Sequence, residues 1–136
     1  MSRVAVVSAL CTGLALAGCG LNVQSPDLFL LTRTGQGQTL TLLVNDAGTI
    51  RCNGGRSRHL ADRFLLQARD IAENLDSDVQ NNVHFSTRLA RTFTFKVKLQ
   101  DGTITFPDTA APGHHEVSDA ELFTLQAAQQ ACGLNP

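Results

Sequence analysis

Residues 93–106 read FTFKVKLQDGTITF, two runs in which apolar and polar side chains alternate. Alternation with a period of two is typical of a strand that buries one face and exposes the other. Asp101-Gly102 stands between the runs, and an Asp-Gly pair between alternating segments is the strongest short-range signal for a β-hairpin. Pro107 follows the second run and favours its end, because proline has no N–H group to donate. The stretch therefore predicts two antiparallel strands that cover a core on one side.

Three more β-rich segments precede this hairpin in the chain. Residues 27–34 (DLFLLTRT), 39–44 (TLTLLV) and 49–52 (TIRC) are separated by the sequences GQGQ and NDAG, and NGG follows the third segment. Glycine, asparagine and aspartate are the residues that tight turns require. We therefore expect three strands joined by short turns.

Two segments show the spacing of helices. Residues 60–75 place apolar side chains on one face and charged ones on the other, and the apolar set is Leu60, Phe64, Leu65, Ala68, Ile71, Ala72 and Leu75. Ser118 and Glu121 fit a capping box, which predicts a helix start at residue 118 and an end near Gly133. Its inward side chains are expected to be Leu122, Phe123, Leu125, Ala128 and Cys132. The least patterned stretch, residues 76–91, is expected to be a polar loop.

The order β-β-β-α-β-β-α predicts an α+β fold, with an antiparallel sheet of about five strands and two helices packed on one face. Without residues 1–18, which carry Arg3 and no acid, the chain keeps 10 basic and 12 acidic side chains, a formal net charge of −2. Tryptophan and tyrosine are absent. A near-neutral chain without these rings does not favour nucleic acid as its partner, and we expect a monomer.

The N-terminus has the pattern of an export signal. Met1-Ser2-Arg3 is positively charged, residues 4–15 are mainly apolar, and Leu16-Ala17-Gly18-Cys19 ends the segment. This last sequence resembles the lipobox of bacterial lipoproteins. The resemblance implies cleavage after residue 18, acylation of Cys19 and an anchor on the extracytoplasmic face of the cell membrane. A signal peptide without lipidation is the alternative, whereas the apolar run is too short for a membrane span of about 20 residues.

The lipobox divides the chain into a signal peptide (residues 1–18), a tether (residues 19–26) and a single α+β domain (residues 27–134). The composition is similar to that of uncharacterised exported lipoproteins of actinobacteria. The resemblance implies that Cys11 leaves with the signal and that Cys19 carries lipid, which leaves Cys52 and Cys132 for the domain. We expect a disulfide between them in an oxidising compartment. A redox thiol or a pair of metal ligands is the rival interpretation, although no Cys-x-x-Cys unit is present.

Candidate binding residues fall on three loops. Arg56, Arg58 and His59 precede a helix, where an anion is favoured. His84 lies in the loop of residues 76–91. His114, His115 and Glu116 form a cluster with Asp108 upstream, and a zinc site would need a further ligand such as His59 or His84. No catalytic motif occurs, so neither an enzyme nor a cofactor is expected.

Residues 49–55 (TIRCNGG), followed by His59 and an Ala/Leu-rich helix, resemble the first half of the subtilisin inhibitor-like family. The resemblance implies a secreted serine-protease inhibitor with its reactive loop near residues 76–91. That loop lacks the cysteine of the family's second disulfide. We therefore expect a membrane-anchored lipoprotein that acts as a non-catalytic binding or envelope-associated module for an unknown protein or small molecule. A protease inhibitor and a metal-binding protein that uses His114, His115 and Glu116 are the alternatives.

Overall fold

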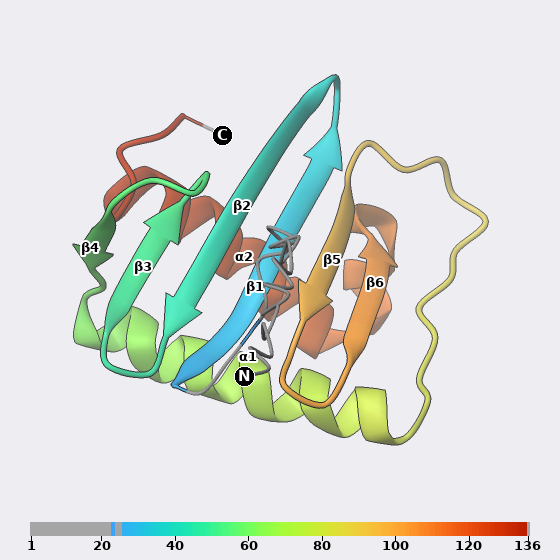
Figure 1. The fold of residues 1–136 in the computed structure, drawn as a ribbon. Helices are drawn as coiled ribbons and strands as arrows, with labels where there is room; N and C mark the ends of the chain where they lie inside the picture. The colour runs from blue at the N-terminus through green and yellow to red at the C-terminus, as the bar shows by residue number, and fades with distance from the viewer. Residues whose placement is uncertain (1–22, 24–25, 136) are drawn as a thin grey trace, which may run out of the picture.

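The computed structural model describes residue 23 and residues 26–135. The elements are β1 (Asp27–Gly35), β2 (Gln38–Asn45), β3 (Thr49–Cys52), β4 (Ser57–His59), α1 (Asp62–Gln80), β5 (Thr94–Lys98), β6 (Thr103–Pro107), the short 3₁₀ helix η1 (Asp108–Gly113) and α2 (His115–Gln130). The strands form one antiparallel sheet in the order β4-β3-β2-β1-β5-β6, and both helices lie behind it in Figure 1. The expected α+β fold is confirmed, with six strands instead of about five.

The extra strand is β4, which the glycines and arginines after Cys52 had indicated as a loop. Its three residues are all exposed, and they pair with β3. A strand of three residues is too short to show alternation of apolar and polar side chains. It is held by backbone hydrogen bonds to β3. The sequence pattern therefore gave no sign of it.

The sheet buries one face because each strand alternates. Phe29, Leu31, Leu42 and Val44 on β1 and β2 are fully buried, and Phe95, Val97, Ile104 and Phe106 continue this layer on β5 and β6. Phe123 of α2 packs edge-to-face on Phe29 and on Phe64 of α1. One core therefore joins both helices to the sheet.

The two helices differ from their expected bounds. α1 continues through Gln80, so the first part of the expected loop at residues 76–91 is helical. α2 begins at His115, and the Ser118 N–H donates to the His114 carbonyl within its first turn. The capping box at Ser118 and Glu121 is therefore wrong, since both residues lie inside the helix.

The earlier start of α2 also changes which side chains face inward. Its buried residues are Val117, Ala120, Phe123, Thr124, Ala127 and Ala128. Phe123, Ala128 and Cys132 are buried as expected, whereas Leu122 and Leu125 are 48% and 42% exposed. The buried face of α2 therefore carries mostly small residues, while the two leucines are partly exposed.

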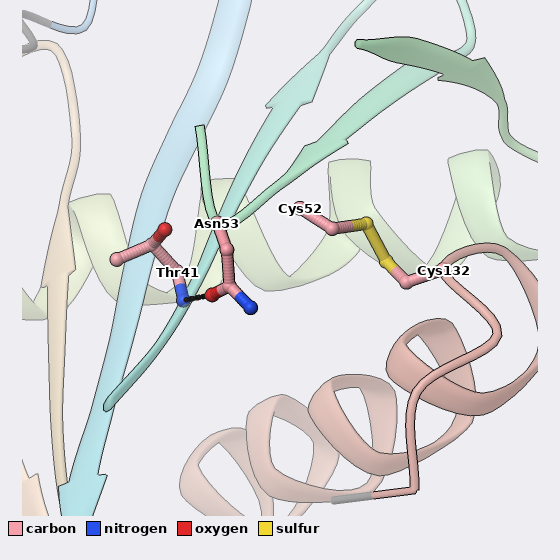
Figure 2. The surroundings of a disulfide bond; sticks show 4 residues. All are labelled: Thr41, Cys52, Asn53 and Cys132. Atoms are coloured by element: carbon pink, nitrogen blue, oxygen red, sulfur yellow. Dashed lines mark hydrogen bonds between the residues drawn. A yellow bond between two sulfur atoms is a disulfide. The ribbon is translucent and has the colours of Figure 1, made fainter. Parts of the chain in front are cut away.

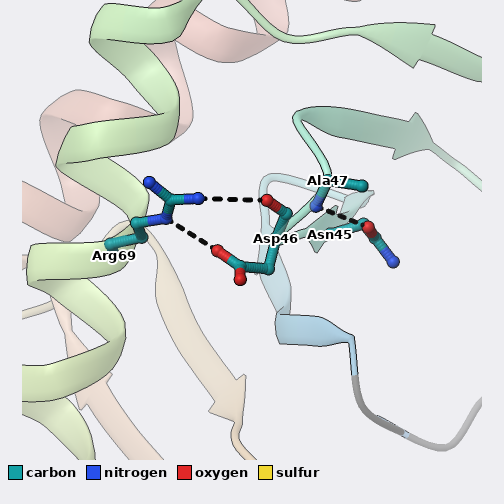
Figure 3. A network of polar contacts seen from close by, with 4 residues as sticks. All are labelled: Asn45, Asp46, Ala47 and Arg69. Carbon is teal, nitrogen blue, oxygen red and sulfur yellow. Dashed lines mark hydrogen bonds and ion pairs between the residues drawn. The ribbon is translucent and has the colours of Figure 1, made fainter.

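The turn between β2 and β3 is attached to α1, as Figure 3 shows. The Asn45 side-chain oxygen accepts a hydrogen bond from the Ala47 N–H at 2.8 Å, which is the pattern of an Asx turn. The Arg69 guanidinium donates to the Asp46 carboxylate at 2.7 Å and to the Asp46 carbonyl at 3.3 Å. The expected turn at residues 45–48 is confirmed, and it contacts the middle of α1 through Arg69.

The β5–β6 hairpin is confirmed, but the structure gives a further reason why residue 102 is glycine. The Leu99 N–H donates to the Gly102 carbonyl, so the chain reverses over Gln100 and Asp101. A Cβ atom on Gly102 would lie 2.5 Å from the Val79 Cγ1 atom of α1. Glycine is therefore required because the helix passes close to the turn, and the sequence alone showed only the turn.

Cys52 and Cys132 form the expected disulfide, with their Cα atoms 6.0 Å apart (Figure 2). The bond joins the end of β3 to the segment that follows α2, and 80 positions separate the two cysteines in the chain. The signal peptide and Cys19 lie outside the described residues. Within the described part of the chain, no helix is long and apolar enough to cross a membrane.

Candidate functional site

The structure separates the expected binding residues into two groups. Arg56, Arg58 and His59 lie at β4, one edge of the sheet, and their side chains are exposed. His84 lies beside β6, the opposite edge, where it shares a hollow with strand residues. No single site can therefore use both groups.

A loop of residues 81–93 follows α1 and runs alongside β6 (Figure 1). Phe85 anchors this loop, since it is only 7% exposed and stacks edge-to-face on Phe106 of β6 and on the His114 ring. Where the loop returns to the sheet, the Thr92 and Phe93 N–H groups donate to the Asp108 carboxylate. The loop is therefore held at both ends next to β6.

His114, His115 and Glu116 lie together at the start of α2. Glu116 accepts contacts from the Nδ1 atoms of His114 and His115 at 3.3 and 3.0 Å. The pKa of Asp78 is raised by burial and then by the Glu116 charge, while the two histidines lower it. Across the described residues, no group of three or more histidine, cysteine or acidic side chains is placed to hold a metal ion. Metal binding at this cluster stays a prediction.

The outer edge of β6 presents unpaired backbone groups. The Asp108 N–H donates to the Phe93 carbonyl and the Leu99 N–H to the Gly102 carbonyl, so Ile104 and Phe106 exchange the hydrogen bonds with β5. The N–H and carbonyl groups of Thr103 and Thr105 then point away from β5. Within the described residues no hydrogen bond reaches them. This edge is therefore open to another strand.

Two adjoining hollows follow this edge, and Thr105 lines both. One of about 310 Å³ lies against the end of α1 and the start of the loop, and its lining is Val79, Asn82, Val83, His84, Thr103, Ile104 and Thr105. The other, of about 220 Å³, lies further along β6 and is lined by Phe85, Ser86, Thr87, Leu89, Arg91, Thr94, Thr105, Phe106 and Pro107. We call this pair of hollows with the open strand the β6 groove.

The loop that borders the β6 groove carries basic side chains. Residues 81–93 contain Arg88, Arg91 and His84 but no acid, and Arg91 lines the groove. Lys96 is exposed on the uncovered face of the neighbouring strand. Of the acids nearby, Asp108 already accepts backbone hydrogen bonds, and Glu116 contacts His114 and His115. An anionic partner is therefore favoured here over a cationic one.

The sequence indicated the loop and the histidines but missed the open backbone of Thr103 and Thr105. Alternation places these threonines on the exposed face and says nothing of which strand ends the sheet. A second missed group is Glu121, whose pKa is raised to about 7 by burial and by the charge of Asp108. Its Oε1 atom is buried, and no described residue forms a hydrogen bond with it. The chain matches no protein-family model, no curated protein and no solved structure.

Proposed function

We propose that this chain is a membrane-anchored, non-catalytic lipoprotein module that binds an extended acidic segment of a partner protein along the β6 groove. The observation that carries the binding half is the open backbone of Thr103 and Thr105, flanked by two hollows. An extended peptide can add a strand to such an edge, with backbone hydrogen bonds for affinity and side-chain pockets for specificity.

The anchor is supported by the lipobox at residues 16–19 and by the compartment that a disulfide implies. Disulfides persist outside the cytoplasm and are rare within it, and Cys52–Cys132 is such a bond. Eight residues, 19–26, separate the lipidated end from β1. At about 3.6 Å per residue they span at most about 29 Å. A lipid on Cys19 would therefore keep the domain next to the membrane.

The two edges of the sheet are not equivalent as docking sites. β4 has three residues, with Arg58 at its centre, and short charged edge strands discourage pairing. β6 has five residues, and the loop anchored by Phe85 forms a second wall beside it. An acidic strand laid along β6 would pass Arg91, which lines the groove.

The edge is tested by a substitution that removes one outward donor. The probe is a fluorescent blocked hexapeptide of alternating threonine and glutamate, added to the full-length chain in detergent. We expect saturable binding by anisotropy, weakened by added salt, and loss of at least about tenfold in affinity for Thr105→Pro, because proline lacks the N–H group. Thr105→Val keeps that group and is the matched control.

Equal binding by Thr105→Pro, confirmed as folded by its circular dichroism, would contradict docking at this edge. Equal or tighter binding of a threonine–lysine hexapeptide would contradict the acidic partner.

The anchor is tested separately by Cys19→Ser. The unmodified chain is expected in the membrane fraction and labelled by an alkyne fatty acid, whereas Cys19→Ser is released and unlabelled. Cys11→Ser serves as the control, since residue 11 lies within the expected signal peptide. An unlabelled wild-type chain, or Cys19→Ser that stays in the membrane, would refute the lipid anchor without touching the β6 groove.

A further inference from the structure

Arg33 of β1 is a buried cation, and the described residues supply no counter-charge for it. It is 6% exposed and lies opposite Leu40 of β2 and Phe95 of β5. Its guanidinium carbon is 4.7 Å from the centroid of the Phe93 ring. Among the described residues, no carboxylate or hydrogen-bond acceptor contacts the guanidinium.

This environment is unfavourable for arginine as it stands. Arginine stays charged in proteins, and a buried charge needs a partner to offset the loss of water. The Phe93 ring supplies a cation–π contact, which is weaker than an ion pair with two hydrogen bonds. Burial lowers the pKa of Arg33, the direction expected when a cation has no anion beside it.

Arg33 also lines a small hollow at the end of the sheet. The hollow measures about 150 Å³, and its lining is Arg33, Gln38, Thr39, Leu40, Asn53, Leu134 and Asn135. None of the described residues that line it is acidic. It lies close to the Cys52–Cys132 bond, between the β1–β2 turn and the segment that follows α2.

Two amide side chains add donors to the same space. The Asn53 Oδ1 atom accepts the Thr41 N–H at 2.9 Å, so its Nδ2 group is turned away from β2 and remains free to donate (Figure 2). Gln38 stands two residues from Leu40 on β2 and so shares its face of the strand. The hollow thus combines one cation, amide donors and the apolar side chains of Leu40 and Leu134.

We propose that this hollow binds a small carboxylate, with Arg33 as its ion partner and the Asn53 amide as a further donor. A carboxylate accepts two parallel hydrogen bonds from a guanidinium. Its single charge matches the single cation of the hollow, whereas dianionic phosphate would bring a second, unpaired charge. The carboxylate has two possible sources, a free organic acid or the C-terminus of a peptide.

The test follows the Arg33 Nε–H resonance of the full-length chain in detergent, assigned with Arg33→Lys. Acetate, acetyl-Gly-Ala and the C-terminal amide of acetyl-Gly-Ala are titrated at pH 7, with sodium chloride balancing ionic strength. We expect saturable shifts with acetate or acetyl-Gly-Ala and none with the amide. Tighter binding of acetyl-Gly-Ala would identify a peptide C-terminus as the source, and tighter binding of acetate a free acid.

Variants separate a site from general anion effects. Arg33→Met keeps the apolar stem of the side chain but removes the cation. Acetate should then bind about tenfold more weakly or not at all. Binding to each variant is measured as the rise in melting temperature that acetate causes. Asn53→Asp keeps the acceptor for Thr41 and places a carboxylate at the hollow, so it should also abolish acetate binding. Arg69→Met removes an exposed guanidinium and is the control.

Unsaturable wild-type shifts with both carboxylates would overturn the proposal. Tighter binding of phosphate than of acetate would overturn the carboxylate class. An acetate response in Arg33→Met equal to that of Arg69→Met would overturn the role of Arg33.

Discussion

Glu121 is a single side chain whose environment conflicts with its charge. It lies on α2, where burial and the nearby charge of Asp108 raise its pKa to about 7 from an ordinary value of 4.5. The folded state therefore binds a proton more tightly than the unfolded state. Between about pH 4.5 and pH 7 the folded chain holds more protons, so its stability falls as the pH rises through this window.

Glu121→Gln should remove this dependence. Glutamine stays neutral, so we expect its melting temperature to exceed that of the wild type above pH 7, with the difference shrinking toward pH 4.5. Calorimetry of both proteins from pH 4 to pH 8 measures the difference, and Glu73→Gln, an exposed position on α1, is the control. A constant difference between wild type and Glu121→Gln across the range would contradict the raised pKa.

Single residues also show where inference from the sequence succeeds and fails. Cys52 and Cys132 could be paired by elimination, because only two cysteines were left for the domain. Glu121 was expected to cap a helix, because a Ser-x-x-Glu pattern has the same letters inside a helix as at its start. The reason for Gly102 was invisible, because Val79 lies 23 positions away in the chain.

Among the elements, the loop of residues 81–93 and β6 form one unit. Hydrophobic alternation predicted β5, β6 and their turn, because each strand faces the core on one side. It could not predict that β6 ends the sheet, since strand order depends on pairing between distant segments. The loop has little periodicity, and its position depends on Phe85 packing against Phe106 and His114.

Phe85→Ala should release this loop from β6. Truncation of a buried phenylalanine to alanine lowers the free energy of unfolding by about 3–5 kcal/mol in well-packed cores. We expect a smaller decrease for Phe85→Ala, because the loop can move away without unfolding the rest of the protein. We expect trypsin to cleave at Arg88 and Arg91 at least about tenfold faster, as the loop opens locally. Leu89→Ala, at an exposed loop position, is the control. Equal cleavage rates in wild type and Phe85→Ala would show that another contact holds the loop.

For the whole molecule, the disulfide and the start of β1 lie at different ends of the sheet. Asp27, where β1 begins, lines the same hollow as Asp101 of the β5–β6 turn. The start of β1 and the β5–β6 turn therefore lie at the same end of the sheet. The disulfide joins β3 to the segment after α2 and leaves the β6 groove untouched.

Removing the disulfide should lower global stability without altering the groove. The bond closes a loop with a sequence separation of 80, and the chain-entropy model gives about 4–5 kcal/mol for a loop of that size. We expect Cys52→Ala with Cys132→Ala to unfold at a lower urea concentration than the oxidised wild type. The same urea midpoint for both proteins would contradict a stabilising role for the bond.

Hydrogen exchange at the β6 edge tests the central claim most directly. In the free protein, the Thr103 and Thr105 amides should exchange rapidly, while those of Ile104 and Phe106 are protected by their bonds to β5. Saturating threonine–glutamate hexapeptide should slow exchange at Thr103 and Thr105 by at least about tenfold, because each N–H would gain an acceptor. Protection of both threonine amides before peptide is added, or unchanged exchange at saturation, would contradict the open edge and the strand addition that we propose.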